Sequence, residues 1–227
     1  DKPKVIFCST NKVYGDNVNR VPVREEGSRY AYADPNYANG IPTDFSIDAC
    51  EHTPYGVSKL AADLYVQDFA RTYGLKTAVF RMSCTYGEGQ SGNEDQGWVA
   101  HFVISILKGR PLTIYGDGKQ VRDVLHVQDL VRAFHAALQS NRAMQGGVFN
   151  IGGGPDNTAS LLEIVHLMKR LTGKEAPLAF ADWRPGDQKV YISDITQAKD
   201  TFGWRPEIPP EDGVARLAHW YRTEFGA

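Results

Sequence analysis

Residues 54–82 read PYGVSKLAADLYVQDFARTYGLKTAVFRM, and this stretch decides the fold class. Its first part predicts a helix that begins at Pro54, a favourable first helical residue, and ends near Gly74, where glycine can close the last turn. The following run, Lys76–Met82, is short, apolar and partly β-branched, which is typical of a buried strand. The helical spacing is carried by apolar residues at Val57, Leu60, Ala61, Leu64, Tyr65 and Phe69.

A second apolar run, KVIFC at residues 4–8, has the character of a strand that is buried on both faces of a sheet. A strand, a helix and a second strand in this order form a β-α-β unit, and such units build parallel sheets. We therefore expect an α/β protein with a parallel sheet of the doubly wound, Rossmann type. A smaller mixed α+β region is expected to follow it.

The later part of the chain carries shorter signals. Two apolar runs, 112–115 and 120–124, flank the turn Gly116-Asp117-Gly118 and predict a β-hairpin. The polar and aromatic stretch 17–51 is too irregular for a long helix, and we interpret it as an ordered loop insertion near a site. Three further helices are predicted over 127–138, over 161–171 after a capping box formed by Ser160 and Glu163, and from Pro209-Pro210 through Tyr221.

Composition excludes several classes of protein. The 227 residues are 42% hydrophobic and 23% charged, with a formal net charge of -2, so neither nucleic acid nor a membrane surface is an expected partner. Cys8, Cys50 and Cys84 lack C-x-x-C spacing, so no disulfide framework and no metal site are predicted. No run approaches 18 apolar residues, and no signal peptide is recognisable at the start. We expect a soluble protein of the cytoplasm.

Tyr55 and Lys59 stand four residues apart, and therefore on one face of the predicted helix. A free tyrosine has a pKa of about 10 and is a poor base at neutral pH, but a nearby ammonium favours the phenolate. Such a tyrosine could take a proton from a sugar hydroxyl while hydride leaves the same carbon. Taken by itself the pair is weak evidence, because exposed helices often carry it by chance.

Three motifs in a fixed order strengthen that interpretation: STNKVYG at 9–15, YGVSK at 55–59 and FRMSCTYG at 80–87. Together they resemble the extended short-chain dehydrogenase/reductase family, the NAD-dependent epimerases and dehydratases of nucleotide sugars. The residues at these positions are most similar to those of the CDP-paratose and CDP-tyvelose 2-epimerases. The resemblance implies Thr10, Tyr55 and Lys59 as catalytic residues, with Thr10 orienting the reacting oxygen. It also implies NAD as the cofactor, contacted by Tyr55 and Lys59.

The substrate side rests on two more segments. GDGKQVRD at 116–123 and WRPGD at 183–187 resemble the family segments whose arginines hold the diphosphate of the nucleotide sugar. This assigns Arg122 and Arg184 as a diphosphate clamp, since two forked guanidinium groups neutralise and orient such a group together, and Asp187 as a ribose or backbone contact. The resemblance places contacts to the base and sugar at Gln96, Gly97, Trp98, Val99 and Cys84.

A structural interpretation is open for Cys84, for Lys12 and for one glycine-rich motif. Cys84 stands where many family members have asparagine, and a small buried hydrophobic residue is an equal alternative there. Lys12 is either a solvated charge or a charge near the substrate, and the sequence assigns it no role. The glycines in NIGGG at 150–154 follow a late strand, so they predict a turn rather than a phosphate loop.

No Gly-x-x-Gly-x-x-Gly or Gly-x-Gly-x-x-Gly follows an early strand in these residues. Under the resemblance, a Rossmann domain would have roughly a hundred further residues before residue 1, including the phosphate loop. The chain is therefore expected to be truncated and, by itself, to bind NAD weakly or not at all. Residues 1–100, with a returning segment near 124–150, are expected to form the carboxyl-terminal part of the NAD-binding domain, and 101–227 mostly the nucleotide-sugar region. A homo-oligomer or a partner chain could supply the rest.

The expected function is NAD-dependent epimerisation of a nucleotide sugar through transient oxidation to a keto sugar. A 4-epimerase is one alternative within the family, and a 4,6-dehydratase is another. Asn11 and Lys12 disfavour the dehydratase, because those enzymes carry an Asp-Glu pair directly after the catalytic threonine. A third alternative is a non-catalytic module that binds a nucleotide sugar or serves assembly, since the phosphate loop is missing.

Overall fold

A computed structural model describes residues 3–226. The predicted β-α-β unit is present as β1 (Lys4–Thr10), α1 (Pro54–Tyr73) and β4 (Lys76–Met82). The two strands are parallel, with Phe7 opposite Val79, and β8 (Gln145–Ile151) adds a third parallel strand beside β4. The prediction of an α/β fold with a parallel sheet is therefore confirmed. Among residues 3–226, no helix combines the length and the hydropathy needed to cross a bilayer.

Helix α1 begins and ends where the sequence predicts. The Thr53 hydroxyl accepts a hydrogen bond from the Gly56 N–H at 3.1 Å, and Pro54 occupies the first turn. Gly74 closes the helix in the left-handed region, at φ 61°. Every residue of α1 is described, and its buried ones are Gly56 and Asp63 alone. The helix is therefore attached to the sheet less by apolar burial than by polar contacts.

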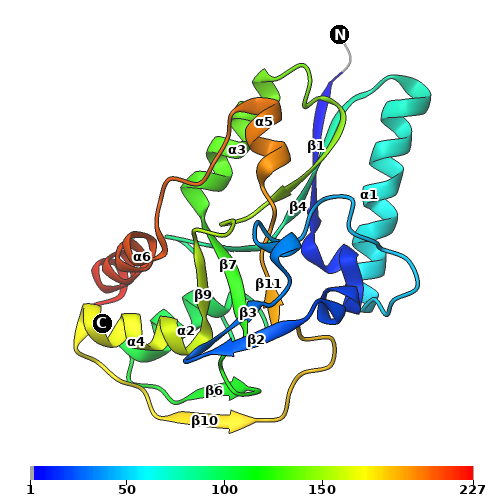
Figure 1. The fold of residues 1–227 in the computed structure, drawn as a ribbon. Helices are drawn as coiled ribbons and strands as arrows, with labels where there is room; N and C mark the ends of the chain where they lie inside the picture. The colour runs from blue at the N-terminus through cyan, green and yellow to red at the C-terminus, as the bar shows by residue number, and fades with distance from the viewer. Residues whose placement is uncertain (1–2, 227) are drawn as a thin grey trace.

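The sheet lies between two helical layers. Helix α1 covers one face of β1 and β4, and α3 (Val127–Gln139) and α5 (Thr196–Phe202) lie on the other side (Figure 1). On that side Phe80 is the centre of an apolar cluster, because its ring contacts those of Phe134, Phe149 and Phe202. This cluster fixes the strands whose ends carry the candidate site.

A second region follows the carboxyl ends of these strands. Its central strand, β7 (Val121–His126), pairs in parallel with β5 (Cys84–Tyr86) and β11 (Val190–Tyr191), and antiparallel with β9 (Thr158–Ser160). Ser160 and Glu163 form the predicted capping box. The region is closed by helices that share one apolar core and lie together in Figure 1: α2 (Trp98–Leu107), α4 (Leu161–Thr172) and α6 (Pro210–Phe225).

The predicted hairpin around Gly116-Asp117-Gly118 is wrong. Strand β6 (Leu112–Tyr115) does not pair with β7; it pairs in parallel with β10 (Leu178–Ala181), with Ile114 opposite Phe180. The glycines at 116 and 118 adopt φ 81° and 78° and let the chain leave the strand direction. A local pattern of two apolar runs around a turn cannot show that the partner strand comes from over 60 residues later.

The insertion at 17–51 is ordered, as the sequence predicts, and it contains a hairpin that the sequence analysis missed. The hairpin strands β2 and β3 pair antiparallel, with Val23 opposite Tyr32. The insertion packs against aromatic residues outside it, because Phe45 contacts the ring of Tyr14, which in turn contacts that of Tyr191. The chain enters the insertion through η1 (Asn11–Arg20), and the insertion then contains β2 (Val23–Glu26), β3 (Arg29–Tyr32) and η2 (Pro35–Tyr37).

Candidate active site

The predicted catalytic residues lie where β1 ends and α1 begins. Thr10 is the last residue of β1 and is almost fully buried; its hydroxyl accepts from the Lys12 N–H at 3.3 Å. Tyr55 lies in the first turn of α1 with 54% of its surface exposed. Lys59, one turn later, donates from Nζ to the Cys8 carbonyl at 3.0 Å. The ammonium is thereby held against the end of the strand that carries Thr10.

Gly56 explains how the helix comes so close to the segment after Thr10. A Cβ at this position would lie 2.9 Å from the Lys12 carbonyl oxygen, which is closer than side chains tolerate. Only glycine therefore lets the first turn of α1 rest on the backbone of Lys12. The glycine between Tyr55 and Lys59 thus has a packing role that the catalytic motif by itself does not reveal.

A buried ion pair fixes α1 to the sheet. Asp63 accepts from Arg81 Nε at 2.9 Å, and both side chains are almost completely removed from solvent. The same carboxylate accepts from the Ser9 hydroxyl at 2.7 Å and from Gln67 Nε2 at 2.6 Å. Ser9 directly precedes Thr10, so this carboxylate links the catalytic helix to the strand that ends in Thr10.

The network continues from Arg81 into the insertion. Arg81 Nη1 donates to the Tyr14 hydroxyl at 3.3 Å, and that hydroxyl donates to Asn150 Oδ1 at 2.7 Å. Burial raises the pKa of Tyr14, which keeps its hydroxyl protonated and able to donate. Asn150 Nδ2 in turn donates to the Ile41 carbonyl at 2.7 Å. Strands β4 and β8, helix α1 and the insertion are therefore joined by one chain of buried polar contacts.

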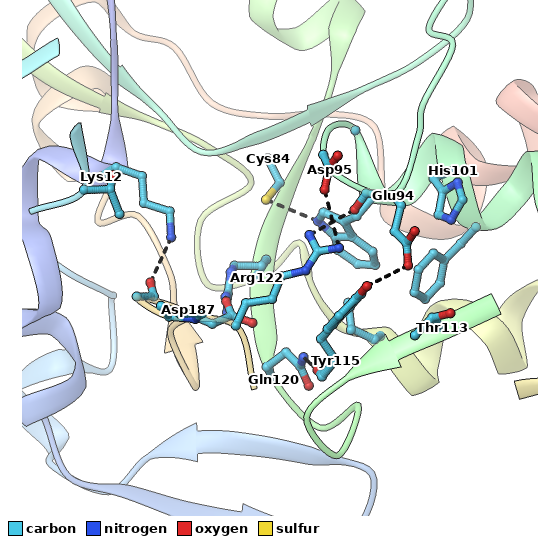
Figure 2. Close-up of a pocket in the computed structure, with 18 residues that line it drawn as sticks. Lys12, Cys84, Glu94, Asp95, His101, Thr113, Tyr115, Gln120, Arg122 and Asp187 are labelled. Atoms are coloured by element: carbon cyan, nitrogen blue, oxygen red, sulfur yellow. Dashed lines mark hydrogen bonds and ion pairs between the residues drawn. The ribbon is translucent and has the colours of Figure 1, made fainter. Parts of the chain in front are cut away.

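Figure 2 shows a cavity of about 390 Å³, whose lining does not include Thr10, Tyr55 or Lys59. It is lined by Lys12, which lies within the STNKVYG motif, and by Thr53, which precedes the YGVSK motif by two residues. A volume of this size lies within the range of small-molecule sites. The other lining residues come from β5, α2, β6, β7, α4 and the loops before α2, β7 and β11, and are Cys84, Glu94, Asp95, Gly97, Trp98, His101, Phe102, Thr113, Tyr115, Gln120, Arg122, Leu161, Arg184, Pro185, Gly186 and Asp187.

Arg122 is held rigidly in the cavity wall. Its Nη1 donates to the carbonyls of Val121 at 2.9 Å and Gln188 at 2.6 Å, while Nη2 contacts Asp187 Oδ1 at 2.5 Å. Asp187 also accepts from the Gln188 N–H at 2.9 Å. Arg122 and Asp187, which the resemblance both assigns to substrate binding, are therefore partners of one another in the structure. An anionic ligand would meet a guanidinium that is already oriented.

Arg184 lies on the ring of Tyr115, with Cζ 3.9 Å from the ring centroid. Its Nη1 donates to the Glu94 carbonyl at 3.0 Å, and the Tyr115 hydroxyl donates to Glu94 Oε1 at 2.9 Å. Asp95 Oδ1 lies 3.7 Å from Arg184 Nη2. The second predicted arginine is thus in the same cavity as Arg122, more than 60 residues away in sequence, and it sits over an aromatic face.

The predicted contact segment at 96–99 is only partly in the cavity. Gly97 adopts φ 73° and starts α2, so Trp98 faces the cavity, where its Nε1 donates to Cys84 Sγ at 3.3 Å. Gln96 and Val99, the other two residues of the segment, do not line the cavity. Gln96 closes a turn with Asn93, and Val99 is buried in the core of the second region. Helical geometry turns successive residues to different sides.

Several cavity residues were missed or given no role in the sequence analysis. Lys12 received no role, and Thr53 was not considered, although it precedes the catalytic helix. Tyr115 directly precedes the GDGKQVRD motif, and this position was the one available signal for it. Glu94 and His101 carry no motif, and burial lowers the pKa of His101. Their place in the cavity depends on how α2 packs beside β6.

The glycines at 152–154 serve a buried carboxylate. Asp123 is fully buried, and it accepts from the Ser83 hydroxyl at 2.5 Å, from the Gly154 N–H at 3.2 Å and from the Ser193 N–H at 3.1 Å. A Cβ at Gly152 would lie 2.0 Å from Asp123 Oδ2. The glycines therefore form a turn around a carboxylate next to Arg122, as the sequence analysis predicted in rejecting a phosphate loop.

Comparison with known proteins places these features in context. The model of the NAD dependent epimerase/dehydratase family matches residues 1–152. The CDP-paratose 2-epimerase of Salmonella typhi is 40% identical over 223 residues, which are 95% of this chain and 64% of that protein.

Solved structures show the same likeness. The UDP-glucose 4-epimerase of Thermotoga maritima, solved with UDP-glucose, has a TM-score of 0.78 and 31% identity, and the match covers 97% of this chain and 64% of that one. The UDP-glucuronic acid 4-epimerase of Bacillus cereus, solved with UDP-glucuronic acid and NAD, has a TM-score of 0.76 and 26% identity over 98% of this chain and 62% of that one. The chain thus spans less than two thirds of the length of these relatives.

Proposed function

The chain belongs to the NAD dependent epimerase/dehydratase family, and on that premise we propose that it carries the catalytic and substrate-binding residues of a nucleotide-sugar epimerase that uses NAD. One observation carries the proposal: Lys12, two residues after Thr10, and Thr53, two residues before Tyr55, line the cavity that also holds Arg122 and Arg184. A proton-transfer centre beside a pair of guanidinium groups suits a sugar linked to a diphosphate.

In this proposal Tyr55 takes the proton from the sugar hydroxyl whose carbon is oxidised, and returns it when the carbon is reduced on the other face. Thr10, held at the end of β1, donates to or accepts from the same oxygen and orients it toward Tyr55. Lys59 lies one turn after Tyr55 on the same helix. NAD, when bound, supplies the acceptor of the hydride. Tyr55 is exposed and Lys59 is fixed by the Cys8 carbonyl, so both fit contact with that cofactor.

The cavity supplies the substrate side of the proposal. Arg122 and Arg184 bind the diphosphate, and Asp187, which holds Arg122 in place, adds a ribose or backbone contact. Cys84, Gly97 and Trp98 line the wall beside them and contact the nucleotide sugar. The 40% identity to the enzyme from Salmonella typhi named CDP-paratose 2-epimerase supports a CDP-sugar substrate and reaction at C2.

The same proposal covers the organisation of the chain. Residues 1–100 and the returning segment near 124–150 contribute the sheet and the catalytic residues of the cofactor domain. Residues 101–227 contribute mostly the nucleotide-sugar region. The cavity supports this division, because Lys12, Thr53 and Cys84 line it from the first part while Arg122, Arg184 and Asp187 line it from the second.

The test uses the protein that carries these 227 residues, incubated with NAD and CDP-tyvelose and followed by proton NMR. Conversion to CDP-paratose is the expected result. Tyr55→Phe should lower kcat by about 10²- to 10⁴-fold, because the proton-transfer group is lost, and should leave the affinity for CDP unchanged. Tyr65→Phe is the matched control, since Tyr65 lies on the same helix and is 68% exposed. Full activity in the Tyr55→Phe variant would contradict the proposed role.

A further inference from the structure

Lys12 is the cation of the cavity that lies nearest a catalytic residue in sequence. It follows Thr10 by two residues, and its own N–H is hydrogen-bonded to the Thr10 hydroxyl. Its carbonyl faces Gly56 of the catalytic helix, and its side chain lines the cavity together with Thr53, the residue that caps that helix. The backbone of Lys12 thus belongs to the catalytic centre and its side chain to the substrate cavity.

The ammonium of Lys12 is poorly compensated. Among residues 3–226 the structure gives it one hydrogen bond, from Nζ to the Gly186 carbonyl at 3.3 Å. Asp187 is near, but its Oδ1 is engaged by Arg122 at 2.5 Å and by the Gln188 N–H at 2.9 Å. Burial lowers the pKa of Lys12, and the neighbouring Arg122 lowers it further. A half-buried ammonium with three donors and one backbone acceptor has capacity for oxygen acceptors from a ligand.

The cationic side chains of the cavity lie at different positions across it. Figure 2 shows Lys12 at one side, Arg122 toward the middle, and Tyr115 and His101 toward the other side. Arg184 lies on the Tyr115 ring, so it belongs to the side away from Lys12. If the two guanidinium groups hold the diphosphate, the part of the ligand that extends toward Lys12, Thr53 and the catalytic helix is the sugar rather than the base.

We infer that Lys12 binds the sugar of the nucleotide sugar, by donating from Nζ to a hydroxyl or keto oxygen of the pyranose, and that it thereby helps to select the sugar. This inference rests on the proposed function. A lysine ammonium offers donors only, so it favours a sugar with an oxygen at the contacted carbon over a deoxy sugar. It also favours the keto form, whose oxygen cannot donate and can only accept.

A purely structural role for Lys12 predicts something different. In that case its bond to the Gly186 carbonyl would serve to hold the segment that carries Asp187, and Asp187 holds Arg122. Loss of Lys12 would then loosen the diphosphate contact, and binding of a plain nucleoside diphosphate would suffer as much as binding of the nucleotide sugar. The two roles can therefore be separated by comparing ligands with and without the sugar.

The experiment measures by calorimetry the affinity of the protein for CDP and for CDP-paratose. Lys12→Met should weaken the binding of CDP-paratose by about 10- to 100-fold, as expected for loss of a hydrogen bond from a charged donor, and should change that of CDP by less than about 3-fold. Lys169→Met is the control, because Lys169 is exposed on α4 and paired with Glu175. Lys12→Gln, which retains length and polarity, repeats the measurement if the methionine variant does not fold.

Equal loss of affinity for the two ligands would overturn the inference in favour of the structural role. Unchanged affinity for both would overturn it as well. These outcomes leave the proposed function standing, since wild-type binding of CDP-paratose is measured in the same series. If the wild type binds neither ligand, the proposed function fails first, and the inference that rests on it fails with it.

Discussion

Asp63 offers the sharpest test of how the catalytic helix is held. Its carboxylate is fully buried and accepts from Arg81 Nε at 2.9 Å and Nη2 at 3.4 Å, from Ser9 at 2.7 Å and from Gln67 at 2.6 Å. Asp63→Asn keeps the shape of the side chain and removes its charge. The amide NH₂ of the asparagine then takes the place of one carboxylate oxygen. This NH₂ is a donor, and the groups around it are donors as well.

The expected loss of stability follows from the burial of Arg81, the ion-pair partner of Asp63. Arg81 is almost completely buried, so loss of the carboxylate leaves a guanidinium without its counter-charge in the interior. Breaking a buried pair in this way costs about 3–5 kcal/mol of unfolding free energy. Since α1 has Gly56 as its other buried residue, little apolar packing on the helix can offset the loss. With a urea m-value up to about 3 kcal/mol/M, the unfolding midpoint should fall by at least about 1 M.

Urea unfolding followed by far-ultraviolet circular dichroism measures this midpoint. The control is Glu175→Gln, which breaks an exposed ion pair with Lys169 on the surface and should leave the midpoint where it is. Asp63→Asn should also lower kcat more than it raises KM, because Ser9 and Thr10 are adjacent on β1. A midpoint within about 0.3 M of the wild type would refute the idea that this pair anchors the helix.

Three further predictions concern the cavity and its support. Gly152→Ala should cost about 1–3 kcal/mol or more in urea unfolding, because the new Cβ would lie 2.0 Å from Asp123 Oδ2; an unchanged midpoint would disprove the clash. Arg122→Met should weaken CDP binding about 10- to 100-fold in calorimetry through loss of a charged contact, and unaltered affinity would exclude Arg122 from the clamp. Burial lowers the pKa of His126 despite Glu88 at 3.0 Å, so the unfolded state binds more protons and stability falls as pH falls below about 6.5. His126→Gln should reduce that slope, by up to about 1.4 kcal/mol per pH unit, whereas the exposed substitution His219→Gln should not.

The sequence predicts the central fold well where the determinants are local. The helix from Pro54 to Tyr73 and the strand Lys76–Met82 have the predicted bounds, because a proline and a glycine mark the ends of the helix in the chain itself. The hairpin at 112–124 failed for the opposite reason. Strand β6 takes its partner from β10, and the partner of a strand is chosen by tertiary packing rather than by the turn that follows it.

For the candidate site, the motifs point to individual residues but not to their neighbours. Trp98 and Val99 are adjacent in sequence, yet one lines the cavity and the other lies in the core, since the start of α2 turns them apart. For Lys12 the sequence leaves two interpretations open, a solvated charge and a charge near the substrate. Its position between the catalytic helix and Arg122 becomes visible only when the strands are assembled.

The sequence by itself determined the pair Tyr55 and Lys59, since four residues on a helix span one turn and place both side chains on one face. It also determined the parallel β-α-β unit that carries them. The tertiary structure alone decided that Arg122 and Arg184 share one cavity, that Asp187 holds Arg122, and that Lys12 lines the same cavity. These contacts join segments far apart in the chain, and no local periodicity or spacing encodes how such segments meet.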